Sequence, residues 1–272
     1  RGPQAGAFGA NAAGGVVRLV TNAPTSYWTG QLEGSVGGDH LRAGGFAFGG
    51  PLIAGKPEAL MMRLAVQRSA GDGFRRNVTL NRDTNARDEF TARLRLTANP
   101  SPAWRWDGAL LFSEVNNGFD EFALDNNGRR TFSDQPGRDE QRSRAASLRG
   151  RYTGFAGARL TAVTGGSWVK ARYSYDDDWT AASYQGFSDL RRDRTVSNQE
   201  LRLDSALTRG ASGWIDRWTL GAFFSNTDET TAYTNEDPGN LRGLRTKYQA
   251  DNLALFGQIA HAFSAPTRLI LG

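Results

Sequence analysis

The chain has 272 residues, enough for one large domain or two ordinary ones, and it contains no cysteine, which excludes disulfides, thiolate zinc sites and cysteine nucleophiles. Its formal net charge of +5 comes from 33 basic and 28 acidic residues that are interspersed, which is typical of a mixed solvated surface rather than of a nucleic-acid partner. No stretch approaches the ~18 consecutive apolar residues of a membrane-spanning helix, but strands that are apolar on one face only would escape this test.

The first 25 residues form a glycine-rich segment that ends in an apolar run. They read RGPQAGAFGANAAGGVVRLVTNAPT. Glycine permits positive φ and close backbone approach, and Pro3 fixes the chain after Gly2. The apolar residues of 16–20 predict a short strand buried on both faces.

From residue 60 onward, apolar and polar residues alternate along most of the chain. In residues 90–97 the even positions carry Phe, Ala, Leu and Leu, and the odd positions carry Thr, Arg, Arg and Thr. Similar stretches begin near residues 60, 104, 148, 200, 218 and 253. A period of two over about seven residues predicts a strand with one apolar and one polar face. About eleven such strands are expected.

The connections between these strands are expected to alternate in length. Short turns rich in Gly or Pro fall at residues 99–103, 153–157 and 265–267, and long polar stretches fall at residues 71–89, 116–144, 176–195 and 228–246. The long stretches exceed an ordinary connection in a compact domain. Tight turns at one end and long loops at the other are typical of an outer-membrane barrel, whereas a soluble sandwich has turns every 8–12 residues or so.

The two faces of the predicted strands differ in chemistry. The polar face carries charges, as at Glu200, Arg202 and Asp204, which suits a wet lumen. The aromatic residues near predicted strand ends are Trp28, Trp104, Trp106, Trp168, Trp218 and Phe263. They indicate girdles at the two membrane interfaces, although aromatic residues are enriched in any strand.

The glycine-rich segment resembles the closing segment of the plug domain in TonB-dependent receptors. The pattern there is Arg-Gly-Pro, then Tyr or Phe followed by Gly, a small polar residue, Gly-Gly, and an apolar strand ending in Thr. The matching positions are Arg1, Gly2, Pro3, Phe8, Gly9, Asn11, Gly14, Gly15 and Thr21. Ala5 and Ala10 depart from it. Residues 197–203 and 253–258 resemble barrel strands of the same family more weakly.

This resemblance implies an all-β fold. Residues 1–25 would be the end of the plug, and residues 26–272 the N-terminal part of an antiparallel transmembrane β-barrel that is partial and open. The signal peptide, the energy-coupling box and the remaining plug and barrel strands are expected outside this chain.

The resemblance also implies a function. It places the protein in the bacterial outer membrane, in contact with outer-membrane lipid and with a TonB-type energy-coupling protein. It implies active uptake of a scarce ligand, such as a ferric siderophore, that is not transformed, so neither enzyme activity nor a cofactor is expected. The alternatives are a passive or gated porin-like barrel and a soluble β-sandwich binding module.

Two sets of candidate site residues follow. The loops at residues 116–144 and 176–195 combine charge with aromatic rings, so we expect them at one end of the sheet, forming a ligand entrance. Their candidate rings are Phe119, Phe122, Phe132, Trp179, Tyr184 and Phe187. Receptors of this family commonly hold the plug by Arg–Glu pairs, so Arg1 is expected to pair with an inner-wall carboxylate, with Glu200 as the candidate. The alternative is that Glu200 pairs with an arginine on an adjacent strand.

Catalytic and metal sites are not expected. The two histidines, His40 and His261, lie far apart in the sequence, and neither has a metal-ligand partner at a useful spacing. No nucleophile motif such as Gly-x-Ser-x-Gly occurs.

Overall fold

The computed structural model describes residues 19–126, 128–181, 186–205, 217–237, 240–263 and 267–272. Within these ranges the ordered elements are strands, and there is no helix that could cross a membrane. The strands of the main sheet are β1 (Thr29–Val36), β2 (Arg42–Pro51), β3 (Leu60–Gly71), β6 (Arg87–Ser101), β7 (Trp104–Phe119), β9 (Gly137–Phe155), β10 (Ala158–Asp176), β11 (Phe187–Ser205), β12 (Arg217–Asp237), β13 (Asn240–Ala262) and β14 (Arg268–Leu271).

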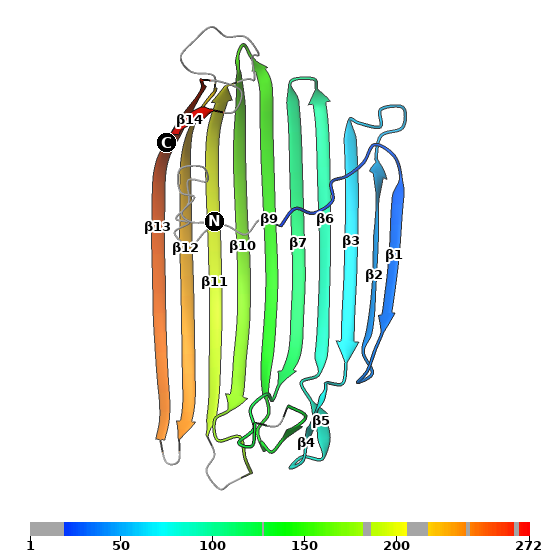
Figure 1. Ribbon diagram of the computed structural model, residues 1–272, viewed down its shortest axis with the longest axis vertical. Helices are drawn as coiled ribbons and strands as arrows, with labels where there is room; N and C mark the ends of the chain where they lie inside the picture. The colour runs from blue at the N-terminus through cyan, green and yellow to red at the C-terminus, as the bar shows by residue number, and fades with distance from the viewer. Residues whose placement is uncertain (1–18, 127, 182–185, 206–216, 238–239, 264–266) are drawn as a thin grey trace.

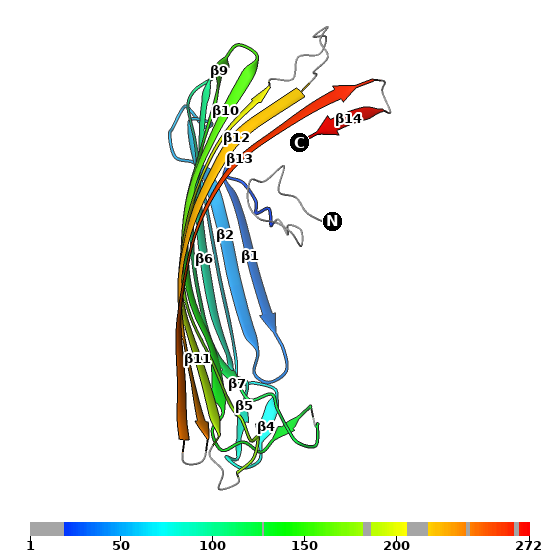
Figure 2. The ribbon, with the colours of Figure 1, turned by 90° about the vertical axis from the view of Figure 1, so that its left-hand side faces the viewer.

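These strands form one 11-stranded antiparallel sheet in which each strand pairs with the next (Figure 1). A small second sheet has the order β5-β4-β8 and consists of β4 (Arg75–Asn77), β5 (Arg82–Thr84) and β8 (Arg130–Thr131). The main sheet is strongly curved and open, with its first and last strands unpaired to each other (Figure 2). The expected all-β, antiparallel, partial barrel is therefore confirmed.

The concave face is polar. The chain from residue 19 to residue 28 runs along this face (Figure 2), where Arg95 donates hydrogen bonds to the carbonyl oxygens of Thr21, at 2.7 Å, and Asn22, at 3.0 Å. Because side chains alternate along a strand, the register places further charged residues on the side of Arg95. They include Asp107, Arg149 and Glu200, on β7, β9 and β11.

The convex face carries an exposed apolar band. Leu148, Leu201 and Leu253 expose 46%, 53% and 78% of their surface. Among the described residues, the buried hydrophobic side chains are only those of Met61, Phe256 and Ala260. A soluble protein rarely exposes so continuous an apolar surface. Within the described residues no second sheet packs face to face on this layer, which rules out the β-sandwich alternative.

Aromatic side chains border this band at both ends. At the short-turn end Trp104 stacks on Trp106 at 5.4 Å and contacts Tyr152 at 4.7 Å. At the other end Phe112 and Trp168 lie in one row of the sheet, joined through Arg144 of β9. Phe112 follows Trp104 by eight residues (112 − 104) on β7, which is about 26 Å along a strand. A tilted strand crosses a membrane with about 9–11 residues, and the span from Trp104 to Phe112 agrees with this length.

The prediction of a long loop over residues 228–246 is wrong. Residues 228–237 belong to β12 and residues 240–246 to β13, and the two strands pair as far as Asp237 and Asn240. The other long connections are shorter than expected, because β7 continues to Phe119, β9 begins at Gly137 and β11 begins at Phe187. In these outer parts of the strands both faces carry polar residues, so the alternation that marks a strand disappears.

The expected strand over residues 16–20 is also wrong for its described part. Leu19 and Val20 lie outside any strand and expose 88% and 77% of their surface. A strand buried on both faces needs neighbours, and no described strand pairs with this segment. The rest of the glycine-rich motif, including Phe8 and the candidate residues Arg1, Gly2, Pro3, Gly9, Asn11, Gly14 and Gly15, lies outside the described residues.

Candidate functional site

Three long connections of the described part of the chain lie together at one end of the sheet, the lower end in Figure 1. They are residues 72–86 between β3 and β6, residues 120–136 between β7 and β9, and residues 177–186 between β10 and β11. The turns after β6 and β9 lie at the opposite end. The two loops expected to form an entrance are therefore neighbours, and their role in ligand binding stays a prediction.

A buried carboxylate joins the first two connections. The carboxylate of Asp120 accepts hydrogen bonds from the Asn77 side-chain amide at 3.0 Å and from the hydroxyls of Thr131 and Ser133, each at 2.6 Å. All four residues are buried. The Asn85 side chain adds two bonds with the Asp120 backbone, at 3.0 and 2.7 Å. A fully satisfied buried network of this kind is rigid, so the loops form one unit.

Aromatic rings gather on the concave side of this end. Phe119 contacts Tyr173 at 4.7 Å and Phe122 at 5.7 Å, and Phe122 stacks on Trp179 at 5.1 Å. Tyr175 contacts both Phe122 and Tyr173. Phe119 has the concave parity of Asp107 on β7, and Tyr173 and Tyr175 have the concave parity of Val163 on β10. We call Phe119, Phe122, Tyr173, Tyr175 and Trp179 the entrance cluster.

Three of the six predicted rings belong to the entrance cluster. Phe132 takes part in none of the ring contacts of the entrance cluster. Its backbone carbonyl oxygen accepts a hydrogen bond from the Thr79 hydroxyl at 2.6 Å. Phe187 has the convex parity of β11, opposite to Glu200, so it does not line the concave side. Tyr184 lies outside the described residues. Tyr173 and Tyr175 were missed, although their spacing of two residues is a signal that they share a face.

A second carboxylate positions Trp179. Buried Asp176 accepts hydrogen bonds from the backbone N–H groups of Asp178 and Trp179, at 3.0 and 3.1 Å. Trp179 adopts a φ of 59°, which is uncommon for a bulky residue and requires such local support. Asp176 lies beyond the apolar band, and burial raises the pKa of its carboxyl, while the backbone bonds oppose this rise.

Only one partner of the expected contact between plug and wall, Glu200, lies within the described residues. Arg1 lies outside the described residues, so its pairing with Glu200 stays a prediction. Glu200 forms an ion pair with Arg202 at 3.0 Å, on its own strand rather than on an adjacent one. The contact seen between the N-terminal segment and the wall is made by Arg95, which no sequence pattern singled out.

The arrangement resembles solved structures of uptake receptors, although no protein-family model matches the sequence. The ferric yersiniabactin uptake receptor FyuA of Yersinia pestis is 17% identical, with a TM-score of 0.68, over 97% of this chain and 49% of that chain. The ferric citrate transporter FecA, in its unliganded form, is 11% identical, with a TM-score of 0.55, over 89% of this chain and 35% of that chain.

The closed form of the ferric-catecholate import receptor Fiu from E. coli K12 is 10% identical, with a TM-score of 0.53, over 97% of this chain and 52% of that chain. The chain has the fold of these receptors. It spans about half of their length or less. The receptor fold expected from the TonB-dependent resemblance is thus confirmed, and the open edge of the sheet agrees with a partial barrel.

Proposed function

We propose that this chain is part of an outer-membrane receptor that takes up an iron complex, such as a ferric siderophore, with energy supplied through a TonB-type partner. The entrance cluster carries this proposal, because it presents rings at the mouth of a polar concave wall. Phe122 lies on a loop that the Asp120 network holds rigid, and Trp179 lies on a turn that Asp176 supports. The apolar convex band supports a position in the outer membrane. FyuA, FecA and Fiu have names that describe iron-complex uptake.

The entrance cluster suits a first binding step. Phe122 leaves 39% of its surface exposed, so it offers a ring face to a ligand. Aromatic faces stack on flat ligand groups at little cost in side-chain entropy, since each ring has only two χ angles. The ligand is released unchanged further along the wall, which is transport rather than catalysis.

A pair of ring deletions tests the entrance cluster. In the full-length receptor, Phe122→Ala and Trp179→Ala are expected to lower the initial rate of ferric-siderophore uptake by iron-starved cells about ten-fold, as expected for the loss of about 1.4 kcal/mol of stacking. Phe187→Ala is the matched control, because Phe187 lies near the same end but on the convex side. Equal losses in all three variants, or no loss in the first two, would refute the role of the cluster.

The porin-like alternative is tested by energy dependence. A passive pore equilibrates its solute without an energy source, whereas the proposed receptor requires one. Uptake at nanomolar ligand should stop when the proton gradient is collapsed or the TonB-type partner is deleted. Unchanged uptake under both conditions would favour the pore.

A further inference from the structure

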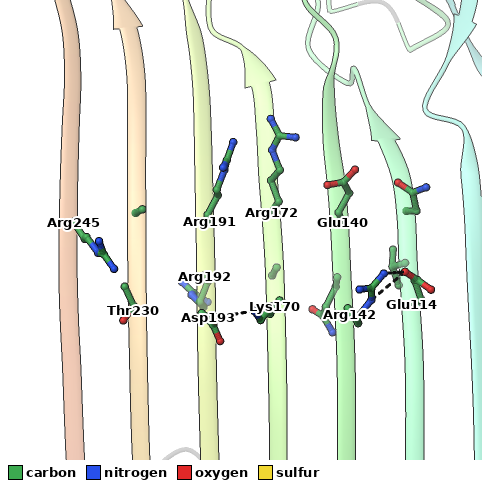
Figure 3. A pocket seen from close by; sticks show the side chains of 15 residues that line it. Glu114, Glu140, Arg142, Lys170, Arg172, Arg191, Arg192, Asp193, Thr230 and Arg245 are labelled. Atoms are coloured by element: carbon green, nitrogen blue, oxygen red, sulfur yellow. Dashed lines mark hydrogen bonds and ion pairs between the residues drawn. The ribbon is translucent and has the colours of Figure 1, made fainter.

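A charged groove lies on the convex face, just beyond the apolar band (Figure 3). It measures about 590 Å³ and crosses the strands from β7 to β13. The charged side chains that reach it from the convex side are the cations Arg142, Lys170, Arg172, Arg191 and Arg245 and the carboxylates Glu114, Glu140 and Asp193. We call this set the rim groove.

The register fixes the height of the rim groove. Glu114, Arg142, Lys170 and Asp193 form one row across the sheet. This row lies two residues beyond the row of Phe112, Arg144 and Trp168, where the apolar band ends. Two residues of strand amount to about 7 Å. The cations therefore begin where the apolar surface stops, at the level of lipid head groups rather than of acyl chains.

The rim groove holds more cationic than anionic groups. Arg142 pairs with Glu114 at 2.5 Å and Lys170 with Asp193 at 3.4 Å, whereas Arg172 and Arg191 share the single carboxylate of neighbouring Asp189. Arg245, and Arg144 at the edge of the band, form no ion pair with the residues that the structure describes. Because the Lys170 side chain is 77% exposed, its pair is solvent-screened and readily exchanged for another anion.

An apolar hollow lies below the rim groove on the same strands. It is lined from the convex side by Trp106, Leu148, Leu201, Phe224 and Leu253. Leu148 follows Arg142 and Arg144 along β9, nearer to the short turn, and lies on the same face of the strand. An amphiphile with acyl chains in this hollow would therefore carry its head group to the cations above.

We propose that the rim groove binds the phosphate groups of an anionic glycolipid of the outer leaflet, with its acyl chains on the apolar band. The inference rests on the outer-membrane position in the proposed function. Guanidinium groups bind phosphate oxygens through paired hydrogen bonds, and Lys170 adds a point charge. Basic side chains at a membrane surface attract anionic lipid head groups in the same way. A soluble phosphate would gain nothing from the apolar hollow, so the continuity of the two surfaces favours a lipid.

The test measures lipid retention on the purified full-length receptor by native mass spectrometry, with a bisphosphorylated acyl glycolipid as the probe. The wild type should retain the lipid, and each of Arg142→Gln, Lys170→Gln and Arg245→Gln should weaken retention about five-fold. The wild type should retain the dephosphorylated glycolipid as weakly as the variant that combines all three rim-groove substitutions retains the phosphorylated one. Millimolar inorganic phosphate should not displace the lipid.

The matched control is the triple variant Arg63→Gln, Arg93→Gln and Arg149→Gln, which removes three cations from the concave face and should leave retention unchanged. Equal retention by the wild type and the rim-groove variants, or equal retention of the dephosphorylated lipid, overturns the proposal. Displacement by inorganic phosphate would assign the groove to a soluble anion and would also overturn it. A receptor found outside the outer membrane on cell fractionation would instead refute the proposed function. The single variant Arg245→Gln keeps the test decisive if the combined rim-groove variant does not fold.

Discussion

The two halves of the long strands present opposite surfaces. In the half near the short turns, the convex face is apolar, as at Leu148 and Leu201, and the concave face is ionic, as in the Glu200–Arg202 pair. In the half near the loops, the convex face carries the rim groove and the concave face carries the entrance cluster. The side that meets lipid must be apolar only across the membrane. Beyond the membrane, charged side chains can lie on the convex face and aromatic rings on the concave face.

The largest expected effect is on the loop half. Asp120→Ala leaves the buried hydroxyls of Thr131 and Ser133 unsatisfied, whereas the Asn77 amide keeps its bonds to Ser133. Each costs about 1–3 kcal/mol. Hydrogen exchange should show that residues 72–86 and 120–136 lose protection, while β9 and β10 keep theirs. Asp134→Ala is the control, a carboxylate in the same loop with no such bonds. Equal loss of protection in both variants would contradict the role of the Asp120 network in holding the two loops together.

The next effect separates the two faces in the membrane half. Leu201→Arg places a charge on the convex apolar band and should lower the free energy of unfolding in lipid vesicles by about 2–4 kcal/mol. Asn198→Arg places the same charge on the concave parity of the same strand and should cost much less. Urea unfolding in vesicles measures both. Similar costs for the two variants would show that lipid does not cover the convex face.

The sequence predicts the membrane half of the strands better than the loop half. Lipid outside and water inside impose an alternation, so the strands at residues 90–97 and 200–204 were predictable, as was the convex or concave side of Leu201 and Glu200. Residues 228–246 were misread because water lies on both sides there, which removes the alternation.

The Asp120 network and the entrance cluster could not be predicted in full. Asp120 and Asn77 form a hydrogen bond although they lie 43 residues apart in the sequence, and no local sequence pattern predicts such a pair. The parity of Phe187 relative to Glu200 has meaning only if β11 extends to Phe187, and the polar sequence between the two residues does not mark this extension. Tyr173 and Tyr175 were within reach, because both fall at the same parity of a strand that continues past Trp168.

The smallest effect concerns pH. Burial raises the folded-state pKa of Asp176 above that of an exposed aspartate, about 3.9, so ionisation of this carboxyl opposes the folded loop. Its contribution to stability is complete below the ordinary value and is lost as pH rises through the raised pKa. Amide protection at Trp179, corrected for intrinsic exchange, should therefore fall as pH rises through that window. Asp176→Asn should abolish this dependence, and protection that rises with pH in the wild type would contradict the assignment.

The most direct test of the central claim, that the membrane half faces lipid on its convex side alone, uses the absence of cysteine in this chain. Single fluorescently labelled cysteines are placed in the full-length receptor by Leu201→Cys, Glu200→Cys and Lys170→Cys, and the receptor is reconstituted in vesicles that contain a quencher on the lipid acyl chains. The label at Leu201 should be strongly quenched, whereas those at Glu200, on the concave face, and at Lys170, beyond the band, should be quenched weakly. Quenching of the Glu200 label as strong as that of the Leu201 label would contradict the account.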